Sequence, residues 1–366
     1  MNKLKHFVDI NELTNKEIFE ILKLMKMLKK ARYNGAVPEL LKNKTLAMIF
    51  EEPSTRTRIS FEAAMTLLGG HAQYLKPGEL HFGDRESLYD TTKVISRMAD
   101  GIFCRALEHK TLLALQKYSD VPVFNGITDY NHPTQAIADI FTMFEHLPMS
   151  KLLKKESITV AFVGDATNVC SSTMHIVTKL GMNFIQIAPK KYQATKEWTD
   201  IAEQYIRAND DKNFLKLTDD VNEIEGADII YTDLWWWVDQ EDQASDRYKD
   251  FMPTYQVNEK MLEKAGSQAQ VMHCLPCARN VELSDGAFDG EQSIIFDQAE
   301  NRLTAQMGLL VYYMYPQIDK ATEAEKLYWK GKIESFMDDK NREWKKRYSY
   351  NNDNEMPFDY LKNVKI

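Results

Sequence analysis

The chain has 366 residues, of which 44% are hydrophobic and 27% are charged, an ordinary globular composition that argues against a disordered, collagen-like or coiled-coil chain. Its 46 lysines and arginines and 54 aspartates and glutamates give a formal net charge of -8, which argues against nucleic acid or a membrane as the main partner. Four cysteines are too few for a disulfide scaffold. The N-terminal segment lacks the apolar core and cleavage site of a signal peptide, and the chain has no apolar run long enough to span a bilayer. We therefore expect a cytoplasmic enzyme of about two domains.

The first part of the chain alternates short apolar runs with helix-length amphipathic segments. The apolar runs predict strands at residues 45–50, 72–75, 101–106 and 121–125. The segments between them predict helices at residues 58–70, 87–100 and 110–119. This repeat predicts a parallel sheet covered by helices on both faces.

The same alternation restarts in the second part of the chain. Strands are predicted at residues 157–165, 183–189, 227–233 and 270–276. A helix from about Pro133 to Leu147 joins the two parts, and a polar, Lys-rich stretch follows it, where we place a hinge. The predicted fold class is α/β, with two doubly wound domains whose parallel sheets are joined by interdomain helices, plus a C-terminal helical extension.

Domain limits follow from this pattern. We expect a first domain over residues 1–147, a second over 148–303, and a last segment over 304–366 that returns to the first domain and ends in a charged tail. After Asp319, five apolar residues recur at helical spacing: Trp329, Ile333, Phe336, Met337 and Trp344. They predict an amphipathic helix that packs on its own chain or on a neighbouring subunit.

One candidate site is the segment Ser-Thr-Arg-Thr-Arg at residues 54–58, which follows a strand and opens a helix. Backbone N–H groups and the helix dipole attract phosphate at such a point, and arginine adds a planar charged fork. The alternative is an ordinary capped helix with surface arginines. The concentration of hydroxyls and arginines favours an anion site, although the segment lacks the glycine-rich turn of a Walker loop.

Two further candidates lie where strands end or helices begin. Arg105 comes near the end of the third predicted strand, where parallel sheets place ligands, although an ordinary ion pair is the alternative. His-Pro-Thr-Gln at residues 132–135 opens another helix. There, His132 can donate to a carbonyl oxygen and Gln135 can bind an amide, while the alternative is a helix cap with a satisfied histidine.

The second part of the chain carries three polar signals. Cys274-x-x-Cys277 admits a redox or zinc site, but zinc needs two more ligands at matching spacing, so we favour a polar strand end that lines a cleft. Asp233 precedes Leu234 and three tryptophans at 235–237, a carboxylate beside indoles that suits an organic ammonium. A core or interface role for the tryptophans stays open. Arg302 closes the segment Phe-Asp-Gln-Ala-Glu-Asn-Arg, which enters a helix.

Four motifs, in this order and spacing, resemble the carbamoyltransferase family of ornithine and aspartate transcarbamylases over about residues 5–318. They are Ser-Thr-Arg-Thr-Arg at 54–58, His-Pro-Thr-Gln at 132–135, His-Cys-Leu-Pro at 273–276 and Phe-Asp-Gln-Ala-Glu-Asn-Arg at 296–302. His-Cys-Leu-Pro and Ala-Glu-Asn-Arg are more similar to the ornithine branch. The resemblance implies a carbamoyl-phosphate domain, an amine-substrate domain, and a homotrimer with shared active sites. No cofactor and no metal are expected, because phosphate is already a good leaving group.

The resemblance also implies roles for individual residues. The catalytic residues would be Arg105, His132 and Cys274. The carbamoyl-phosphate ligands would be Ser54, Thr55, Arg56, Thr57, Arg58, His81, Arg105, His132, Gln135, Cys274, Leu275 and Arg302, with His81 standing where relatives often place a glutamine for the neighbouring subunit. The amine ligands would be Asp233, Trp235, Trp236, Leu275 and Pro276.

Two departures from the ornithine branch concern the second substrate. That branch carries an asparagine pair after the strand equivalent to residues 157–165, whereas here Asn168 is followed by Val169. It also carries Asp-x-Trp-x-Ser-Met-Gly, whereas Asp233 is followed here by Leu-Trp-Trp-Trp-Val. The groups expected to bind an α-carboxylate are therefore missing, and burying a carboxylate without partners is costly.

We therefore expect a diamine acceptor, and the pattern resembles the putrescine-using members of the family, in a reversible reaction that suits agmatine degradation. An ornithine carbamoyltransferase and a non-catalytic ligand-binding paralogue are the alternatives. Cys277 stands where relatives commonly have alanine, and its role stays open.

Overall fold

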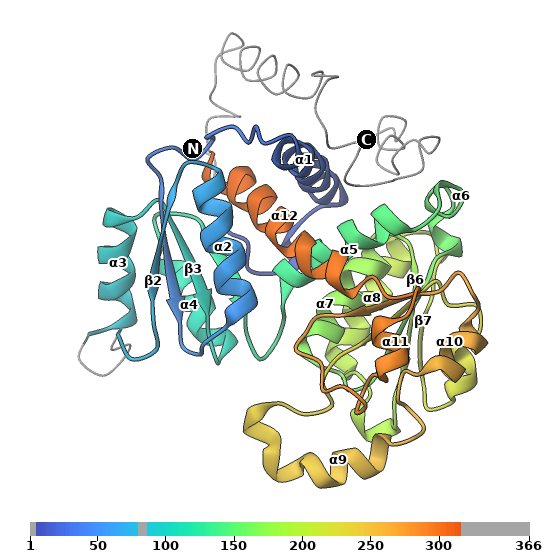
Figure 1. Ribbon diagram of the computed structural model, residues 1–366. Coiled ribbons are helices and arrows are strands. Elements are labelled where there is room, and N and C mark those ends of the chain that lie inside the picture. Colours follow the sequence, from blue (N-terminus) through green and yellow to red (C-terminus); the bar gives the residue numbers. More distant parts are fainter. Residues whose placement is uncertain (1–4, 80–85, 316–366) are drawn as a thin grey trace. The chain divides into compact units, whose positions relative to one another are not determined.

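The structure is a computed structural model that describes residues 5–79 and 86–315. His81 and the amphipathic segment expected after Asp319 lie outside the described residues. The chain divides into two compact units, residues 1–134 with 302–366, and residues 135–301 (Figure 1). The domain limits at residues 147 and 303 stay a prediction.

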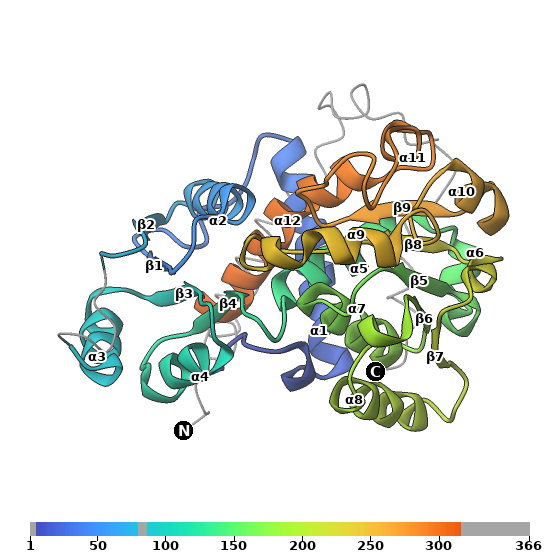
Figure 2. The same ribbon diagram turned by 90° about the horizontal axis from the view of Figure 1, so that it is seen from below.

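Unit 1 is built on a parallel sheet with the strand order β2-β1-β3-β4. Its elements in chain order are η1 (Ile10–Glu12), α1 (Asn15–Tyr33), β1 (Thr45–Phe50), α2 (Thr55–Leu67), β2 (His71–Leu75), α3 (Leu88–Met98), β3 (Gly101–Arg105), α4 (His109–Tyr118) and β4 (Val123–Ile127). Helix α2 covers one face of the sheet, whereas α3 and α4 cover the other (Figure 2).

Unit 2 holds a second parallel sheet, with the strand order β7-β6-β5-β8-β9. Its first elements are α5 (Pro133–His146), α6 (Met149–Leu152), η2 (Lys155–Ser157), β5 (Thr159–Val163), α7 (Asn168–Lys179), β6 (Asn183–Ile187), η3 (Lys190–Tyr192), α8 (Lys196–Ala208) and β7 (Leu215–Thr218). The remaining elements are η4 (Val221–Ile224), β8 (Ile229–Thr232), η5 (Val238–Gln243), α9 (Ala244–Phe251), α10 (Glu259–Ala265), β9 (Gln270–His273), α11 (Asp285–Asp289) and α12 (Ile295–Met314).

Two helices carry the chain from one unit to the other. The first unit boundary follows Thr134 near the start of α5, and the second precedes Arg302 within α12. Within unit 1, the C-terminal part of α12 packs so closely on α1 that a Cβ atom at Gly308 would clash with the Met25 side chain. A two-domain fold with interdomain helices was predicted from the sequence, and the structure confirms this fold class.

The strand order explains where ligands are expected. In each sheet the chain starts in the interior and winds outward in both directions, so a switch point lies between β1 and β3 and another between β5 and β8. Open α/β sheets bind ligands at the carboxyl ends of the strands beside such a point. Ligand-binding residues are therefore expected on the loops that begin near residues 51, 106, 164 and 233.

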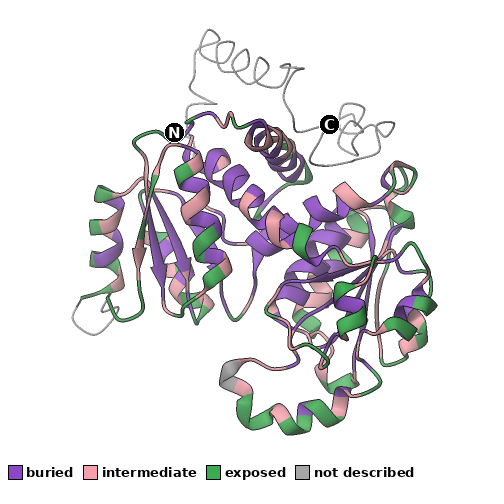
Figure 3. Cartoon of the chain, in the orientation of Figure 1, coloured by how far each residue is buried: buried purple, intermediate pink, exposed green. Residues whose placement is uncertain are grey.

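The cores of both units lie between sheet and helices, and Figure 3 shows most strands as buried. Outer helices such as α3 expose one side, whereas α5 and α7 are buried almost throughout. The strand β7 was not predicted from the sequence. All four of its residues are half-buried at the sheet edge, so they do not form an apolar run. Among the described residues, no helix is both long and apolar enough to cross a membrane.

Candidate active site

The N-terminus of α2 forms the first part of the site in unit 1. Ser54 is its N-cap residue, and the Ser54 side chain makes no capping hydrogen bond to the helix. Thr57, in the first turn, is buried, and its Oγ1 accepts a hydrogen bond from Arg302 Nη2 at 3.2 Å. The sequence places these residues far apart, but α12 brings Arg302 to the start of α2. The result is a helix N-terminus with a guanidinium beside it, which favours an anion.

Arg105 ends β3, the strand that pairs directly with β1. Its side chain is 17% exposed, and its Nη2 lies 3.9 Å from Glu52 Oε2, beyond normal hydrogen-bond distance. Burial is the main cause that lowers the pKa of Arg105, and the nearby charge of Arg56 lowers that pKa further, while Glu52 opposes the shift. Two guanidinium groups thus share one neighbourhood, and a bound anion would relieve their repulsion.

His132 lies just before α5 and is buried. Its pKa is held well below the usual value, first by burial and then by the positive charges of Arg302 and Arg105. The imidazole is therefore neutral at pH 7. Its Nδ1 lies 3.3 Å from Thr134 Oγ1, and when that hydroxyl donates, the imidazole proton sits on Nε2.

Arg58 differs from its neighbours on α2. Its Nε donates to Glu62 Oε1 at 3.0 Å, and its guanidinium lies 3.8 Å from the ring centre of Tyr74. The side chain is 44% exposed. These contacts account for the Arg58 side chain, so we leave it out of the proposed phosphate site, although its sequence position suggested a phosphate ligand.

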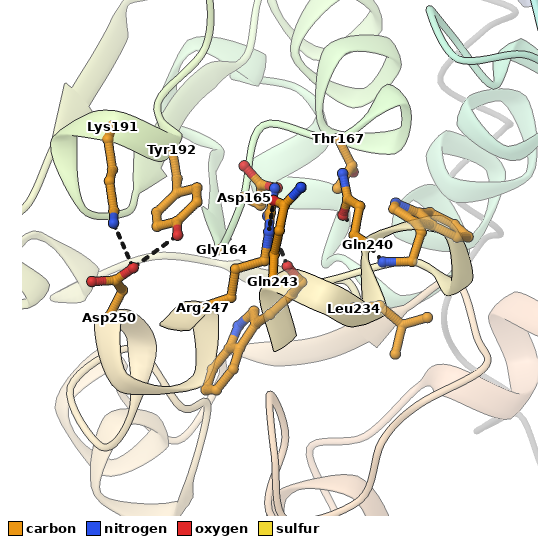
Figure 4. Close-up of polar contacts among 12 residues, drawn as sticks. Gly164, Asp165, Thr167, Lys191, Tyr192, Leu234, Gln240, Gln243, Arg247 and Asp250 are labelled. Atoms are coloured by element: carbon orange, nitrogen blue, oxygen red, sulfur yellow. Dashed lines mark hydrogen bonds and ion pairs between the residues drawn. The ribbon is translucent and has the colours of Figure 1, made fainter. Parts of the chain in front are cut away.

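In unit 2, Asp233 follows β8 directly and is almost completely buried. Its Oδ2 accepts from Thr167 Oγ1 at 3.0 Å, while its Oδ1 accepts from Cys274 Sγ at 3.0 Å and from Leu234 N at 2.8 Å. Figure 4 shows Thr167 and Leu234 on the segments that meet here. A carboxylate has about four lone-pair positions, so these three donors orient Asp233 and leave acceptor capacity for one more.

Gln135 and Asp139 lie one turn apart on α5 and belong to a buried polar network. Asp139 Oδ1 accepts from Gln135 Nε2 and from Gln298 Nε2, both at 2.7 Å, and its Oδ2 accepts from Tyr231 Oη at 2.9 Å. Gln298 also accepts from His273 N at 2.9 Å through its Oε1. Asp139 therefore fixes which end of the Gln135 amide donates and connects α5 to the start of the His-Cys-Leu-Pro segment.

His273 supports the backbone of that segment. Leu275, whose φ is 61°, donates from its backbone N–H to His273 Nδ1 at 2.8 Å. The proton of the neutral imidazole therefore sits on Nε2, which lies 3.1 Å from Glu282 Oε1. Leu275 is half-buried and Pro276 is exposed, so both can face a substrate, whereas His273 is fully buried and acts as a support.

The sequence left a redox or metal role open for this segment. Donor atoms of His273, Cys277 and Glu282 lie within 4.8 Å of one another. However, a metal on His273 Nε2 would move the imidazole proton to Nδ1, against the Leu275 amide hydrogen, so the hydrogen bonds do not fit a metal ligand. Burial first, and then Glu282, raises the pKa of the Cys277 thiol, which makes it a poor thiolate nucleophile.

The tryptophans after Asp233 have different environments. Trp235 is 1% exposed and stacks on Phe251 with ring centres 5.0 Å apart, so it belongs to the hydrophobic core, the alternative considered for it. Trp236 and Trp237 are half-buried. We therefore leave Trp235 out of the proposed substrate wall and keep Trp236.

Three residues with clear roles in these contacts were not singled out from the sequence: Asp139, Thr167 and Gln298. Thr167 had a usable signal, because it follows a strand and caps α7, with its Oγ1 accepting from Cys170 N at 3.3 Å. Asp139 had only one weak signal, an acidic residue within the apolar run Ala-Ile-Ala-Asp-Ile-Phe at residues 136–141. Its partners lie on segments distant in sequence, which a local pattern does not show.

Comparison with known proteins agrees with this geometry. The family profile described as "Aspartate/ornithine carbamoyltransferase, carbamoyl-P binding domain" matches residues 5–145, and the profile for the "Asp/Orn binding domain" matches residues 156–313. Among curated relatives, "Putrescine carbamoyltransferase" of Mycoplasma mycoides subsp. mycoides SC is 67% identical over 96% of this chain and 98% of its own length. "Ornithine carbamoyltransferase" of Archaeoglobus fulgidus is 43% identical over 84% and 97%.

Solved structures show the same relationship. The ornithine carbamoyltransferase from Pyrococcus furiosus superposes with a TM-score of 0.80 at 40% identity, over 85% of this chain and 97% of that chain. Both profiles, the relatives and the fold agree with the resemblance read from the four motifs. The chain therefore belongs to the aspartate/ornithine carbamoyltransferase family and is a carbamoyltransferase.

Proposed function

We propose that this enzyme transfers the carbamoyl group between carbamoyl phosphate and putrescine, to give N-carbamoylputrescine and phosphate. The observation that carries the proposal is Asp233, a buried carboxylate held at the switch point of the second sheet. A carboxylate suits an ammonium group, and the loop after it lacks the Ser-Met-Gly expected for an α-carboxylate. The 67% identity to curated putrescine carbamoyltransferases supports the same acceptor.

In this proposal unit 1 binds carbamoyl phosphate. The phosphate ligands are Ser54, Thr55, Arg56, Thr57 and Arg302. Charge grows on the leaving phosphate as the C–O bond breaks, and the α2 N-terminus together with Arg56 opposes that charge. Unit 1 would thus be the carbamoyl-phosphate domain, close to the expected residues 1–147.

Negative charge also grows on the carbonyl oxygen in the tetrahedral state. Arg105 and neutral His132 are the proposed donors to that oxygen, and a single donor of this kind is typically worth about 3 kcal/mol. Gln135, whose amide is oriented by Asp139, would accept from the carbamoyl NH₂ group. Cys274 and Leu275 would frame the reacting carbon.

The acceptor must attack as a neutral amine, because an ammonium has no lone pair. Asp233 would hold the distal ammonium of the diamine, with Trp236, Leu275 and Pro276 beside its methylene groups. Desolvation lowers the pKa of the attacking amine, and the departing phosphate can take its last proton. Holding the two reactants together supplies much of the remaining rate.

The same family resemblance supports an assembly. We propose a cytoplasmic homotrimer with shared active sites, in which His81 contributes to a neighbouring subunit's carbamoyl phosphate. Sedimentation of the full chain tests this, and a monomer at working concentration would overturn it.

Phosphate release tests the proposed reaction. The purified chain is incubated with carbamoyl phosphate and putrescine, and both phosphate and the ureido product are measured. We expect the two products in equal amounts, and loss of both on removing putrescine. A protein that neither binds carbamoyl phosphate nor turns it over with any primary amine would overturn the assignment, and turnover with ornithine instead of putrescine would reassign the acceptor.

A further inference from the structure

The loop after Asp233 stands where ornithine-using relatives carry Ser-Met-Gly, and a side chain from α9 joins it to other segments of unit 2. Arg247, on α9, donates from Nη1 to Asp165 Oδ2 at 2.6 Å and to the Trp235 carbonyl at 2.9 Å, and from Nε to Gln243 Oε1 at 3.2 Å (Figure 4). One guanidinium therefore joins the loop after β5, the loop after β8 and the helical segment that follows. We call this set of contacts the Arg247 clamp.

Arg247 and Asp233 both form hydrogen bonds with the loop after β5 and with the loop after β8. Asp165 and Thr167 form one turn, in which Thr167 N donates to the Asp165 carbonyl at 2.8 Å, and Thr167 Oγ1 donates to Asp233. On the other loop, Leu234 N donates to Asp233, and the next residue, Trp235, gives its carbonyl to Arg247. The residues that Arg247 contacts are thus close in sequence to the donors of Asp233: Asp165 is two residues before Thr167, and Trp235 directly follows Leu234.

A gain in folding stability does not by itself explain the buried ion pair between Arg247 and Asp165. The Arg247 and Asp165 side chains are only 10% and 16% exposed, and desolvating two charges often costs as much as their attraction returns. Burial is the leading cause that raises the pKa of Asp165, ahead of the opposing hydrogen bond from Arg247. An apolar pair could fill the space at similar stability, but it could not hold the Trp235 carbonyl.

We propose that Arg247 is a positioning residue for the amine acceptor: its clamp on Asp165 and the Trp235 carbonyl keeps the 233–235 loop in the conformation that aims Asp233 at the diamine. This inference rests on the proposed function. Asp165 has a second consequence, because it neutralises a guanidinium that would otherwise repel an ammonium and attract a carboxylate.

The test compares four single variants of the full chain: Arg247→Met, Arg247→Lys, Asp165→Asn and Lys249→Met. Lys249 lies on the same helix with a 70% exposed side chain, so its variant removes an equal charge outside the clamp. For each variant the KM of the acceptor, the KM of carbamoyl phosphate, kcat and the melting temperature are measured. The acceptor used is whichever amine the wild-type enzyme prefers.

We expect Arg247→Met to raise the acceptor KM about tenfold or more, with the carbamoyl-phosphate KM within about twofold of wild type. Arg247→Lys should restore part of the loss, and Lys249→Met should match the wild type. Asp165→Asn should also raise the putrescine KM, and it should raise the ratio of ornithine to putrescine turnover, because Arg247 is then uncompensated.

An unchanged acceptor KM in Arg247→Met would overturn the inference. Equal rises in the KM values of the acceptor and of carbamoyl phosphate, together with a lower melting temperature, would also overturn it. If Arg247→Met does not fold, Asp165→Asn decides by the same criteria. A wild-type enzyme that prefers ornithine would overturn the proposed function. The inference about Arg247 would still be tested, by comparing the change in the acceptor KM with the change in the carbamoyl-phosphate KM. A wild type inactive with every amine would overturn both.

Discussion

The candidate binding residues of unit 1 and those of unit 2 are arranged in different ways. In unit 1, charge is concentrated at a helix N-terminus and a strand end, where Arg56 and Arg105 lie near each other and buried His132 stays neutral beside them. In unit 2, a single carboxylate, Asp233, takes its orientation from Thr167, Cys274 and its own loop. The residues of unit 1 resemble a preformed receptor for an anion. In unit 2, the orientation of Asp233 depends on hydrogen bonds between loops.

This difference suggests which of the two units can acquire a different ligand specificity. A phosphate receptor made from backbone N–H groups and arginines follows from the fold itself, so altering it removes function. An acceptor site that depends on loop contacts can change its ligand when the loop changes. The replacement of Ser-Met-Gly by Trp-Val-Asp at residues 237–239 is such a change.

The largest expected effect contrasts two arginines on α2. Arg56→Gln should weaken carbamoyl-phosphate binding by about 3–4 kcal/mol, a factor of several hundred, because the variant loses the charge that we propose faces the phosphate. Arg58→Gln should change the affinity less than about threefold, since Arg58 is engaged with Glu62 and Tyr74. Calorimetric titration with carbamoyl phosphate measures both, and equal losses would show that the helix face was assigned wrongly.

The next effect concerns the stability of unit 2. Asp139→Ala should lower the free energy of unfolding by about 2–3 kcal/mol, because the buried donors of Gln135, Gln298 and Tyr231 lose their acceptor. Asp200→Ala, on the exposed surface of α8, should change it by less than about 0.5 kcal/mol. Urea unfolding followed by tryptophan fluorescence measures the two, and a similar stability in both variants would contradict the role of Asp139.

A smaller effect is expected on the acceptor alone. Thr167→Val removes a hydrogen bond to Asp233 and should raise the putrescine KM by roughly tenfold, or about 1.4 kcal/mol, while leaving the carbamoyl-phosphate KM near its wild-type value. Thr167→Ser keeps the hydroxyl and serves as the control. Steady-state kinetics at saturating carbamoyl phosphate give the comparison, and a loss confined to carbamoyl phosphate would refute the division of labour between the units.

The smallest effect is on the pH dependence. Because the pKa of His132 is held well below its usual 6.5, the folded enzyme does not take up a proton there when the unfolded chain does. The free energy of unfolding therefore carries no penalty from His132 above pH 6.5 and falls as the pH drops below that value, by up to about 1.4 kcal/mol per pH unit. Unfolding of wild type and His132→Gln at pH 7.5 and 5.5 measures this, and the variant should lose less. A histidine NMR titration of His132 with a midpoint near 6.5 would contradict the assignment.

Much of this molecule could be predicted from local sequence. Apolar runs locate the strands, and the strand ends locate Arg105 and His132 in unit 1 and Asp233 in unit 2, because each parallel sheet binds ligands at the carboxyl ends of its own strands. The edge strand β7 could not be predicted, since its half-buried residues carry no apolar run. The contacts of Asp139 and Arg247 join segments far apart in sequence, and the burial of Trp235 depends on Phe251, so no local pattern reveals them.

Direct competition between acceptors tests the central claim most sharply. Putrescine and ornithine are supplied together at equal concentration with saturating carbamoyl phosphate, and the two carbamoylated products are separated and counted. We predict that carbamoylputrescine predominates by at least about a hundredfold, as expected when one acceptor must bury a carboxylate without partners. Equal amounts, or an excess of citrulline, would contradict this account of the acceptor site.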